Sequence, residues 1–216
     1  PPANPTGTLL SPERLAALRK AVQARNGLLI VDEIYQGLTY RIPASTALTQ
    51  FHDAFVVNSF SKYFGMTGWR LGWLVAPDGY AREIERLAQH FFISPSTVAQ
   101  HAALAAFAPA TLEILEERRA AFEIRRNALL PALRELGFGI AAEPAGAFYI
   151  YADVSAISED SEALARHFIE QAFVATTPGL DFGTHAPRQH LRIAYTTEVP
   201  RLLEAVERMR RCAKQG

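Results

Sequence analysis

Apolar positions follow two different periods in the first part of the chain. Residues 11–27 begin with Ser-Pro, a helix N-cap with proline at the first helical position, and continue with leucines at helical spacing up to Asn26-Gly27. Residues 28–31 and 54–58 are short apolar runs, the pattern of strands buried on both faces of a parallel sheet, and residues 70–75 are a third candidate strand. The pattern predicts a mostly parallel sheet covered by helices (α/β/α).

The rest of the chain changes period twice. Residues 80–137 are mainly helical, with breaks at Ser94-Pro95-Ser96 and near Pro109. Beyond them we expect strands near 138–142, 147–152 and 191–195, and helices near 161–173 and 199–211. This pattern predicts a smaller α/β domain, so we divide the chain into domains 1–108 and 109–216.

Charge and composition narrow the class of protein. The 22 Lys and Arg residues balance the 22 Asp and Glu residues, so no net charge favours nucleic acid or an anionic membrane as a partner. The single cysteine, Cys212, excludes an intramolecular disulfide, and the six histidines lack metal-ligand spacing, so we expect no metal. No apolar run reaches the roughly 18 residues of a membrane span. We expect a cytoplasmic protein.

Polar side chains follow two of the predicted strands. Asp32 comes after the first, and Ser59, Ser61 and Lys62 after the second. Because open α/β sheets bind ligands outside the carboxyl ends of their strands, we expect these side chains in one pocket. A partly buried amine there can attack a carbonyl to form an imine, and a buried carboxylate can keep a pyridine nitrogen protonated. The two hydroxyls with the guanidinium of Arg70 can hold a phosphate. These groups together fit one cofactor.

Four sequence blocks occur in the order typical of one enzyme family. They are Asn4-Pro5-Thr6-Gly7-Thr8, Val31-Asp32-Glu33-Ile34-Tyr35, Ser59-Phe60-Ser61-Lys62 and Gly68-Trp69-Arg70-Leu71-Gly72. They resemble the signature blocks of class I and II aminotransferases of the aspartate aminotransferase superfamily, which are fold type I enzymes dependent on pyridoxal 5'-phosphate (PLP). Phe182-Gly183 and Leu191-Arg192-Ile193-Ala194 extend the resemblance towards the C-terminus. The chain therefore resembles the C-terminal portion of such an enzyme, with part of its large-domain sheet and its small domain.

The resemblance implies a role for each matching residue. Lys62 would hold PLP as a Schiff base and act as the catalytic proton shuttle. Asn4 and Tyr35 would bind the phenolic oxygen of the ring, and Asp32 its nitrogen. Ser59, Ser61 and Arg70 would bind the phosphate, and Arg192 the α-carboxylate of the substrate. The implied reaction moves an amino group between an amino acid and a 2-oxo acid, in a full-length protein that is a homodimer.

Other interpretations remain open at this stage. A lyase, decarboxylase or synthase can use the same fold and cofactor, and a non-catalytic binding module can retain the scaffold. Lys62 can be a solvated surface lysine, the two serines can cap a helix, and the two arginines can form structural ion pairs. Complete family members also carry a glycine-containing phosphate loop, an aromatic residue that stacks on the ring and further strands before the Asn-Pro block. We expect feeble or absent turnover if the protein begins at Pro1.

Overall fold

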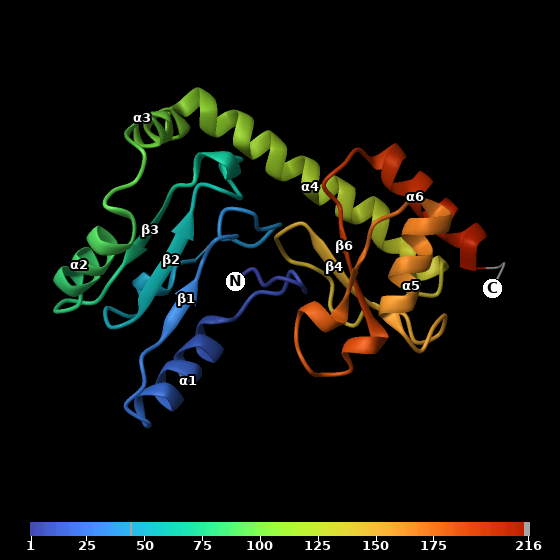
Figure 1. The fold of residues 1–216 in the computed structure, drawn as a ribbon, viewed down its shortest axis with the longest axis horizontal. Coiled ribbons are helices and arrows are strands. Elements are labelled where there is room, and N and C mark those ends of the chain that lie inside the picture. Colours follow the sequence, from blue (N-terminus) through green and yellow to red (C-terminus); the bar gives the residue numbers. More distant parts are fainter. Residues whose placement is uncertain (44, 214–216) are drawn as a thin grey trace. The chain divides into compact units, whose positions relative to one another are not determined.

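The computed structural model describes residues 1–43 and 45–213, which divide into two compact units (Figure 1). Unit 1 comprises residues 1–2 and 9–119, and unit 2 comprises residues 3–8 and the chain from Ala120 onwards. The sequence placed a boundary after residue 108, whereas the units divide between Arg119 and Ala120. The difference arises because a continuous helix begins at Pro109 and runs through this division.

Groups of helices and groups of short strands follow one another along the chain. The helices are α1 (Pro12–Gln23), α2 (Ala81–Phe92), α3 (Thr97–Ala106), α4 (Pro109–Glu135), α5 (Ser161–His167) and α6 (Val199–Ala213). The strands are β1 (Ile30–Asp32), β2 (Phe55–Ser59), β3 (Gly72–Val75), β4 (Tyr149–Asp153), β5 (Thr177–Pro178) and β6 (His190–Ala194). The helices predicted between residues 80 and 137 are confirmed, with breaks at residues 93–96 and 107–108, whereas Pro131 lies inside α4 and does not end it.

Unit 1 contains a three-stranded sheet in the order β1-β2-β3. β1 and β2 are parallel, as predicted, with Asp32 opposite Val57. β3 runs antiparallel to β2, with Ser59 opposite Gly72. A side chain at Gly72 would place its Cβ 2.7 Å from the carbonyl oxygen of Asn58, so glycine permits the close approach of these two strands.

Only one side of β1 is buried in the described structure. Val31 is buried in a cluster with Phe51 and Val56, against which Leu15 of α1 packs, but Ile30 is 66% exposed. All four residues of β3 are exposed. The prediction of strands buried on both faces was therefore wrong for β1, because α1 and its neighbours cover one face only.

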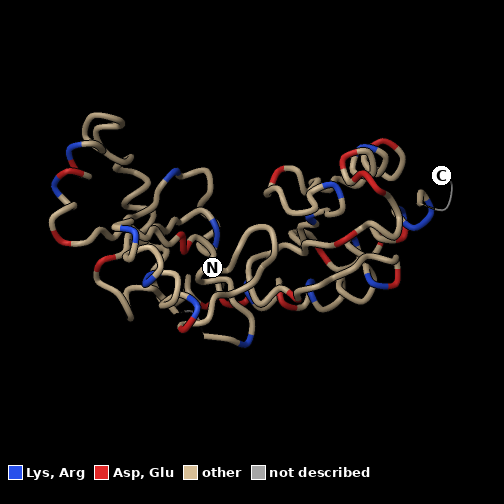
Figure 2. Tube along the Cα trace, turned by 90° about the horizontal axis from the view of Figure 1, so that it is seen from below, with Lys and Arg blue, Asp and Glu red and all other residues tan. Residues whose placement is uncertain are grey.

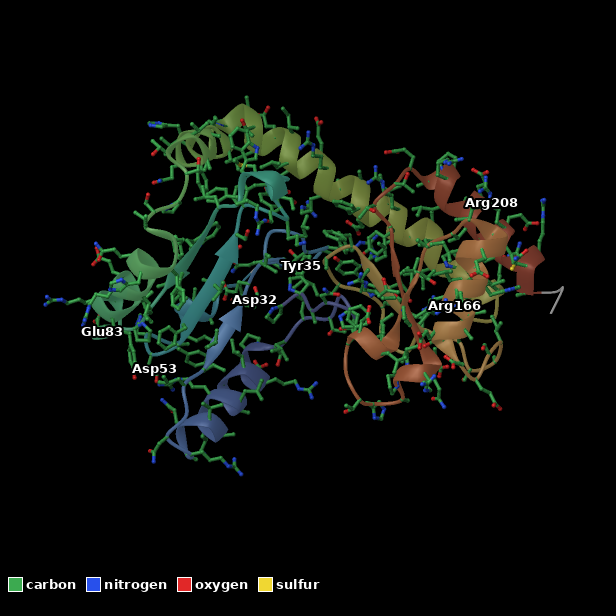
Figure 3. The ribbon with its side chains drawn as sticks, in the orientation of Figure 1. Asp32, Tyr35, Asp53, Glu83, Arg166 and Arg208 are labelled. Carbon is green, nitrogen blue, oxygen red and sulfur yellow. The ribbon has the colours of Figure 1, made fainter. Side chains whose placement is uncertain are left out.

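Helix α1 begins as its sequence predicts. The Ser11 side chain accepts a hydrogen bond from the backbone amide of Arg14 at 3.3 Å. Further along the helix, the guanidinium of Arg19 donates two hydrogen bonds of 2.8 Å to Asp53, which precedes β2 and is labelled in Figure 3. This bidentate pair joins α1 to the sheet of unit 1.

Unit 2 contains a three-stranded antiparallel sheet in the order β4-β6-β5. Ile150 of β4, Leu191 of β6 and Phe168 of the π-helical turn that follows α5 are fully buried. The strand predicted at residues 138–142 was wrong. Gly139 forms an isolated bridge to Asp153, and no ladder continues from it in the described residues, because the chain bends away.

Charged residues of both signs are interspersed along each unit (Figure 2). Among the described residues, no single helix is both long and apolar enough to cross a membrane, and only α3 and α4 taken as a bent pair meet these two conditions.

Candidate active site

The carboxyl ends of β1 and β2 bring the predicted residues of unit 1 to one edge of its sheet. Asp32 is the last residue of β1 and Ser59 the last residue of β2. These strands are parallel neighbours, so the segments that follow them leave the sheet at the same edge. Figure 3 shows Asp32 at the end of β1 and Tyr35 beyond it.

Lys62 lies in the turn after β2 and is partly buried. Its Nζ lies 5.6 Å from the centre of the Tyr35 ring, within the range of a cation–π interaction. Tyr35 itself is only 5% exposed, so the ring is fixed by packing. Lys62 is therefore directed onto an ordered aromatic ring, which differs from a fully solvated surface lysine.

Asp32 is exposed, whereas the sequence predicted a buried carboxylate. The prediction was wrong because the side chain lies on the uncovered face of β1, like that of Ile30. One oxygen, Oδ1, accepts a hydrogen bond from the backbone amide of Ile34 at 3.0 Å. An ionised carboxylate has about four lone-pair sites, so acceptor capacity remains for a protonated ring nitrogen.

Ser59 and Ser61 form a compact turn. Their hydroxyl oxygens are 2.9 Å apart, and Ser59 Oγ also accepts from the backbone amide of Ser61 at 3.0 Å. The alternative that these serines cap an α-helix is wrong, because the residues after them form turns and a 3-10 helix at Thr67–Trp69. Both hydroxyls are partly buried at the edge of the sheet.

Hydrogen bonds connect this serine turn to Arg70. The Thr67 hydroxyl donates to the carbonyl oxygen of Ser61 at 2.6 Å, and Arg70 Nη1 donates to the carbonyl oxygen of Thr67 at 3.0 Å. Arg70 has a left-handed backbone (φ 52°) and lines a cavity of about 650 Å³ together with Pro95 and Ser96. Within residues 1–43 and 45–213 Arg70 forms no ion pair, so its guanidinium retains donors for an anion.

Unit 2 contains the two remaining predicted residues. Arg192 Nη1 donates to Oδ1 of Asn4 at 2.9 Å, and Nη2 donates to the hydroxyl of Thr177 at 3.3 Å. The guanidinium carbon lies 4.3 Å from the centre of the Tyr149 ring and 4.6 Å from that of Phe182. Arg192 forms no ion pair with any described residue, and its buried Nε lacks a hydrogen-bond partner there.

The sequence did not predict the roles of Tyr149 and Thr177 around Arg192. Thr177 is directly opposite Arg192 in the β5–β6 pair, but β5 has only two residues and no detectable pattern. Tyr149 is on β4, where the alternation of apolar residues predicted a strand but not its pairing with β6. The pairing of β4 and β5 with β6 brings Tyr149 and Thr177 close to Arg192, and the local sequence does not reveal this pairing.

The sequence and the structure are both similar to known aminotransferases. Residues 1–209 match the family model for aminotransferase class I and II. The chain is 41% identical over 210 residues to a valine-pyruvate aminotransferase of Mycobacterium tuberculosis, which covers 96% of this chain and 54% of the relative. It is 32% identical over 220 residues to an aspartate aminotransferase of Bacillus subtilis, with coverage of 97% and 55%.

Two solved structures extend the similarity to three dimensions. An aminotransferase from Mycobacterium tuberculosis superposes with a TM-score of 0.94 at 39% identity, covering 100% of this chain and 56% of that one. The aspartate aminotransferase of Thermus thermophilus with maleate gives a TM-score of 0.89 at 35% identity, covering 98% and 55%. The chain spans about half the length of the relatives it matches. On this combined similarity, the chain belongs to the family of class I and II aminotransferases.

Proposed function

We propose that the protein transfers an amino group between an amino acid and a 2-oxo acid and holds pyridoxal 5'-phosphate on Lys62. One observation carries this proposal. The Lys62 amine lies over the buried Tyr35 ring, at the sheet edge where Asp32 ends the neighbouring parallel strand. Membership of the aminotransferase family supports the reaction type.

The side chains of unit 1 fit the chemistry of this cofactor. Lys62 offers an amine to the aldehyde group. Asp32 retains acceptor sites for the ring nitrogen. Ser59, Ser61 and Arg70 combine two hydroxyls with a guanidinium that has no ion-pair partner among the described residues, a donor set suited to a phosphate dianion.

The side chains of unit 2 fit a carboxylate. Two of the five N–H donors of the Arg192 guanidinium are used by Asn4 and Thr177, and the buried Nε lacks a partner in the described structure. Because Asn4 accepts through Oδ1, its Nδ2 group remains the donor that a phenolic oxygen needs. We propose that Arg192 binds the α-carboxylate and that Asn4 and Tyr35 bind the ring oxygen.

The residues then have distinct tasks in the reaction. Bound PLP supplies an electron-accepting ring that stabilises negative charge at the substrate Cα. Asp32 holds a proton on the ring nitrogen by charge pairing. Lys62 would act as the general base that takes up the proton of the substrate Cα. Arg192 would bind and orient the α-carboxylate of the substrate.

We further propose that the full-length protein is a cytoplasmic homodimer. The family resemblance supports the homodimer, and the balanced charge together with a single cysteine supports the location. Sedimentation of the full-length protein tests the homodimer directly, because a monomer at micromolar concentration would contradict it.

Reduction and peptide mapping test the proposed function. The purified chain is incubated with PLP, reduced with borohydride and digested, and a pyridoxyl group is expected on the peptide that contains Lys62. The full-length protein is then assayed with a panel of amino acids, with and without 2-oxo acids. Keto-acid-dependent exchange of the amino group supports transamination. Release of ammonia or carbon dioxide without such dependence would indicate the alternative, a PLP-dependent lyase or decarboxylase.

A further inference from the structure

Tyr63 follows Lys62 directly, and its ring lies against Gly37. A Cβ atom added to Gly37 would be 2.5 Å from Cγ and 2.6 Å from Cδ2 of the Tyr63 ring, closer than any side chain allows. Gly37 is two residues after Tyr35, in a segment with successive turn hydrogen bonds, including Leu38 N to the Tyr35 carbonyl oxygen at 2.8 Å. The residue after Lys62 therefore contacts the backbone of the segment that carries Tyr35.

The other end of Tyr63 is fixed to α4. Its hydroxyl donates to Glu116 Oε1 at 2.6 Å, and Arg119 Nε donates to Oε2 of the same carboxylate at 2.7 Å. Arg119 Nη1 also donates to the carbonyl oxygen of Thr39 at 3.0 Å. These contacts form a closed circuit from Tyr63 through α4 to Thr39 and back along the chain to Gly37.

The protonation states of Tyr63 and Glu116 favour the hydrogen bond between them. Burial, together with the neighbouring Glu116 carboxylate, raises the pKa of Tyr63 to about 12, so its hydroxyl remains a donor at neutral pH. Burial opposes the ionisation of Glu116, but the hydrogen bonds from Tyr63 and Arg119 outweigh it and lower the pKa of that carboxyl. Both partners keep the protonation states that their contact requires.

We propose that Tyr63, Glu116 and Arg119 form a positioning triad that holds the Lys62 amine against the Tyr35 ring. Lys62 has a flexible four-carbon side chain, and an amine that must reach one aldehyde benefits when its backbone is fixed on both sides. The triad acts through Lys62. Its catalytic meaning rests on the proposed function, but its geometric effect can be measured without PLP.

The Lys62 side chain itself serves as the NMR probe in the test. The sequence contains three lysines, Lys20, Lys62 and Lys214. In protein labelled with ¹³C-lysine, the ε-methylene signal of Lys62, assigned with K62R, is expected to show a nuclear Overhauser effect to the Tyr35 ring. Y63F keeps the ring over Gly37 and removes the hydroxyl, whereas E116A removes the carboxylate. We expect the effect to be lost in both variants.

Glu117 supplies the matched control. It is the next residue on α4 and is exposed, so E117A makes the same change on the same helix, and its Overhauser effect should equal that of the parent chain. Circular dichroism confirms that all variants fold. The double variant Y63F/E116A should behave like either single variant, because the triad acts as a unit. An Overhauser effect that persists in folded Y63F overturns the proposal.

A second readout separates this proposal from the proposed function. If Lys62 binds PLP, the rate of borohydride-trapped attachment should fall about 10-fold in Y63F, since a small misplacement of a reacting group can cost on the order of 100-fold. Loss of the Overhauser effect, combined with no PLP attachment even in the parent chain, supports the triad and rejects the cofactor site. Normal attachment with an unchanged Overhauser effect in Y63F rejects the triad alone.

Discussion

The two units bury their apolar residues to different extents. Unit 2 has fully buried side chains on both its helices and its sheet, such as Leu133 of α4 and Ile150 of β4. In unit 1 Phe91, Ile93 and Leu104 are 80%, 82% and 70% exposed. Most of the exposed large hydrophobic side chains among the described residues belong to unit 1. Unit 2 thus has a core of its own, whereas the residues of unit 1 leave much apolar surface uncovered.

Both units nevertheless direct a cation onto aromatic rings. Lys62 of unit 1 faces Tyr35, and Arg192 of unit 2 lies between Tyr149 and Phe182. In unit 2 the Tyr149 ring is buried and the Phe182 ring is partly buried, whereas in unit 1 Lys62 lies in a turn whose next residue, Tyr63, is hydrogen-bonded to α4. Polar contacts can therefore hold the backbone near a functional side chain even in a unit that leaves much of its apolar surface exposed.

The largest expected effect is on the chemistry of unit 1. K62A removes the amine that PLP would bind, so we expect complete loss of the borohydride-trapped pyridoxyl group, measured by mass spectrometry. K20A is the control, because Lys20 lies on α1, away from the strand ends, and should retain full labelling of Lys62. Equal labelling of the parent chain and K62A would contradict the assignment of this lysine.

The contrast in burial predicts that the same substitution, leucine to alanine on a helix, lowers the free energy of unfolding much more in unit 2 than in unit 1. Leu133→Ala in unit 2, at a residue that is 0% exposed, should lower the free energy of unfolding by about 2–5 kcal/mol. Leu104→Ala in unit 1, where the leucine is 70% exposed, should change it by less than about 0.5 kcal/mol. Urea unfolding followed by circular dichroism measures both. Equal losses would mean that unit 1 buries Leu104 in solution.

Replacing Arg192 tests whether the cation of unit 2 binds a carboxylate. R192K keeps the charge but loses the planar donors and the stacking on both rings. Binding of 2-oxoglutarate, followed by NMR titration, should weaken about 10-fold to 100-fold, because hydrogen bonds to charged groups contribute roughly 1.5–3 kcal/mol.

R188K is the matched control for this titration. Arg188 pairs with Asp160 on the surface at 2.7 Å, and its replacement should leave the binding of 2-oxoglutarate unchanged. The same loss of binding in both variants would show that Arg192 has no special role.

The smallest expected effect concerns acid stability in unit 2. Asp160 caps α5, and the backbone amide of Ala163, opposed by burial and assisted by the Glu162 amide and Arg188, holds the pKa of this carboxyl below its usual value. A carboxyl with a lowered folded-state pKa stabilises the fold above its unfolded pKa of about 3.9, and this stability is lost as the pH falls through the folded-state pKa.

D160N should therefore reduce the acid sensitivity of unfolding. Urea midpoints of the parent chain and D160N are compared at pH 7 and at decreasing pH below about 4, where the carboxyl begins to protonate. We expect D160N to be less stable at pH 7 and the difference to shrink in acid. A constant difference at all pH values would exclude the carboxyl charge as the cause.

The sequence by itself determined most of the helices and strands and the family to which the chain belongs. The N-cap at Ser11, the apolar runs before Asp32 and Lys62, and the breaks near Pro95 and Pro109 are local features, so they were readable without the fold. The four blocks that resemble the aminotransferases are also contiguous in the chain, and the comparisons confirm that family.

Only the tertiary structure decided burial, strand direction and the contacts that hold each cation. The exposure of Asp32, the antiparallel β3 and the absence of a strand at residues 138–142 depend on which surfaces meet, and a local pattern does not specify this. Tyr63 meets Glu116 across 53 positions of sequence, and Arg192 meets Asn4 across 188. Such pairs arise because folding brings distant backbone segments within hydrogen-bond distance, so no local pattern in the sequence predicts them.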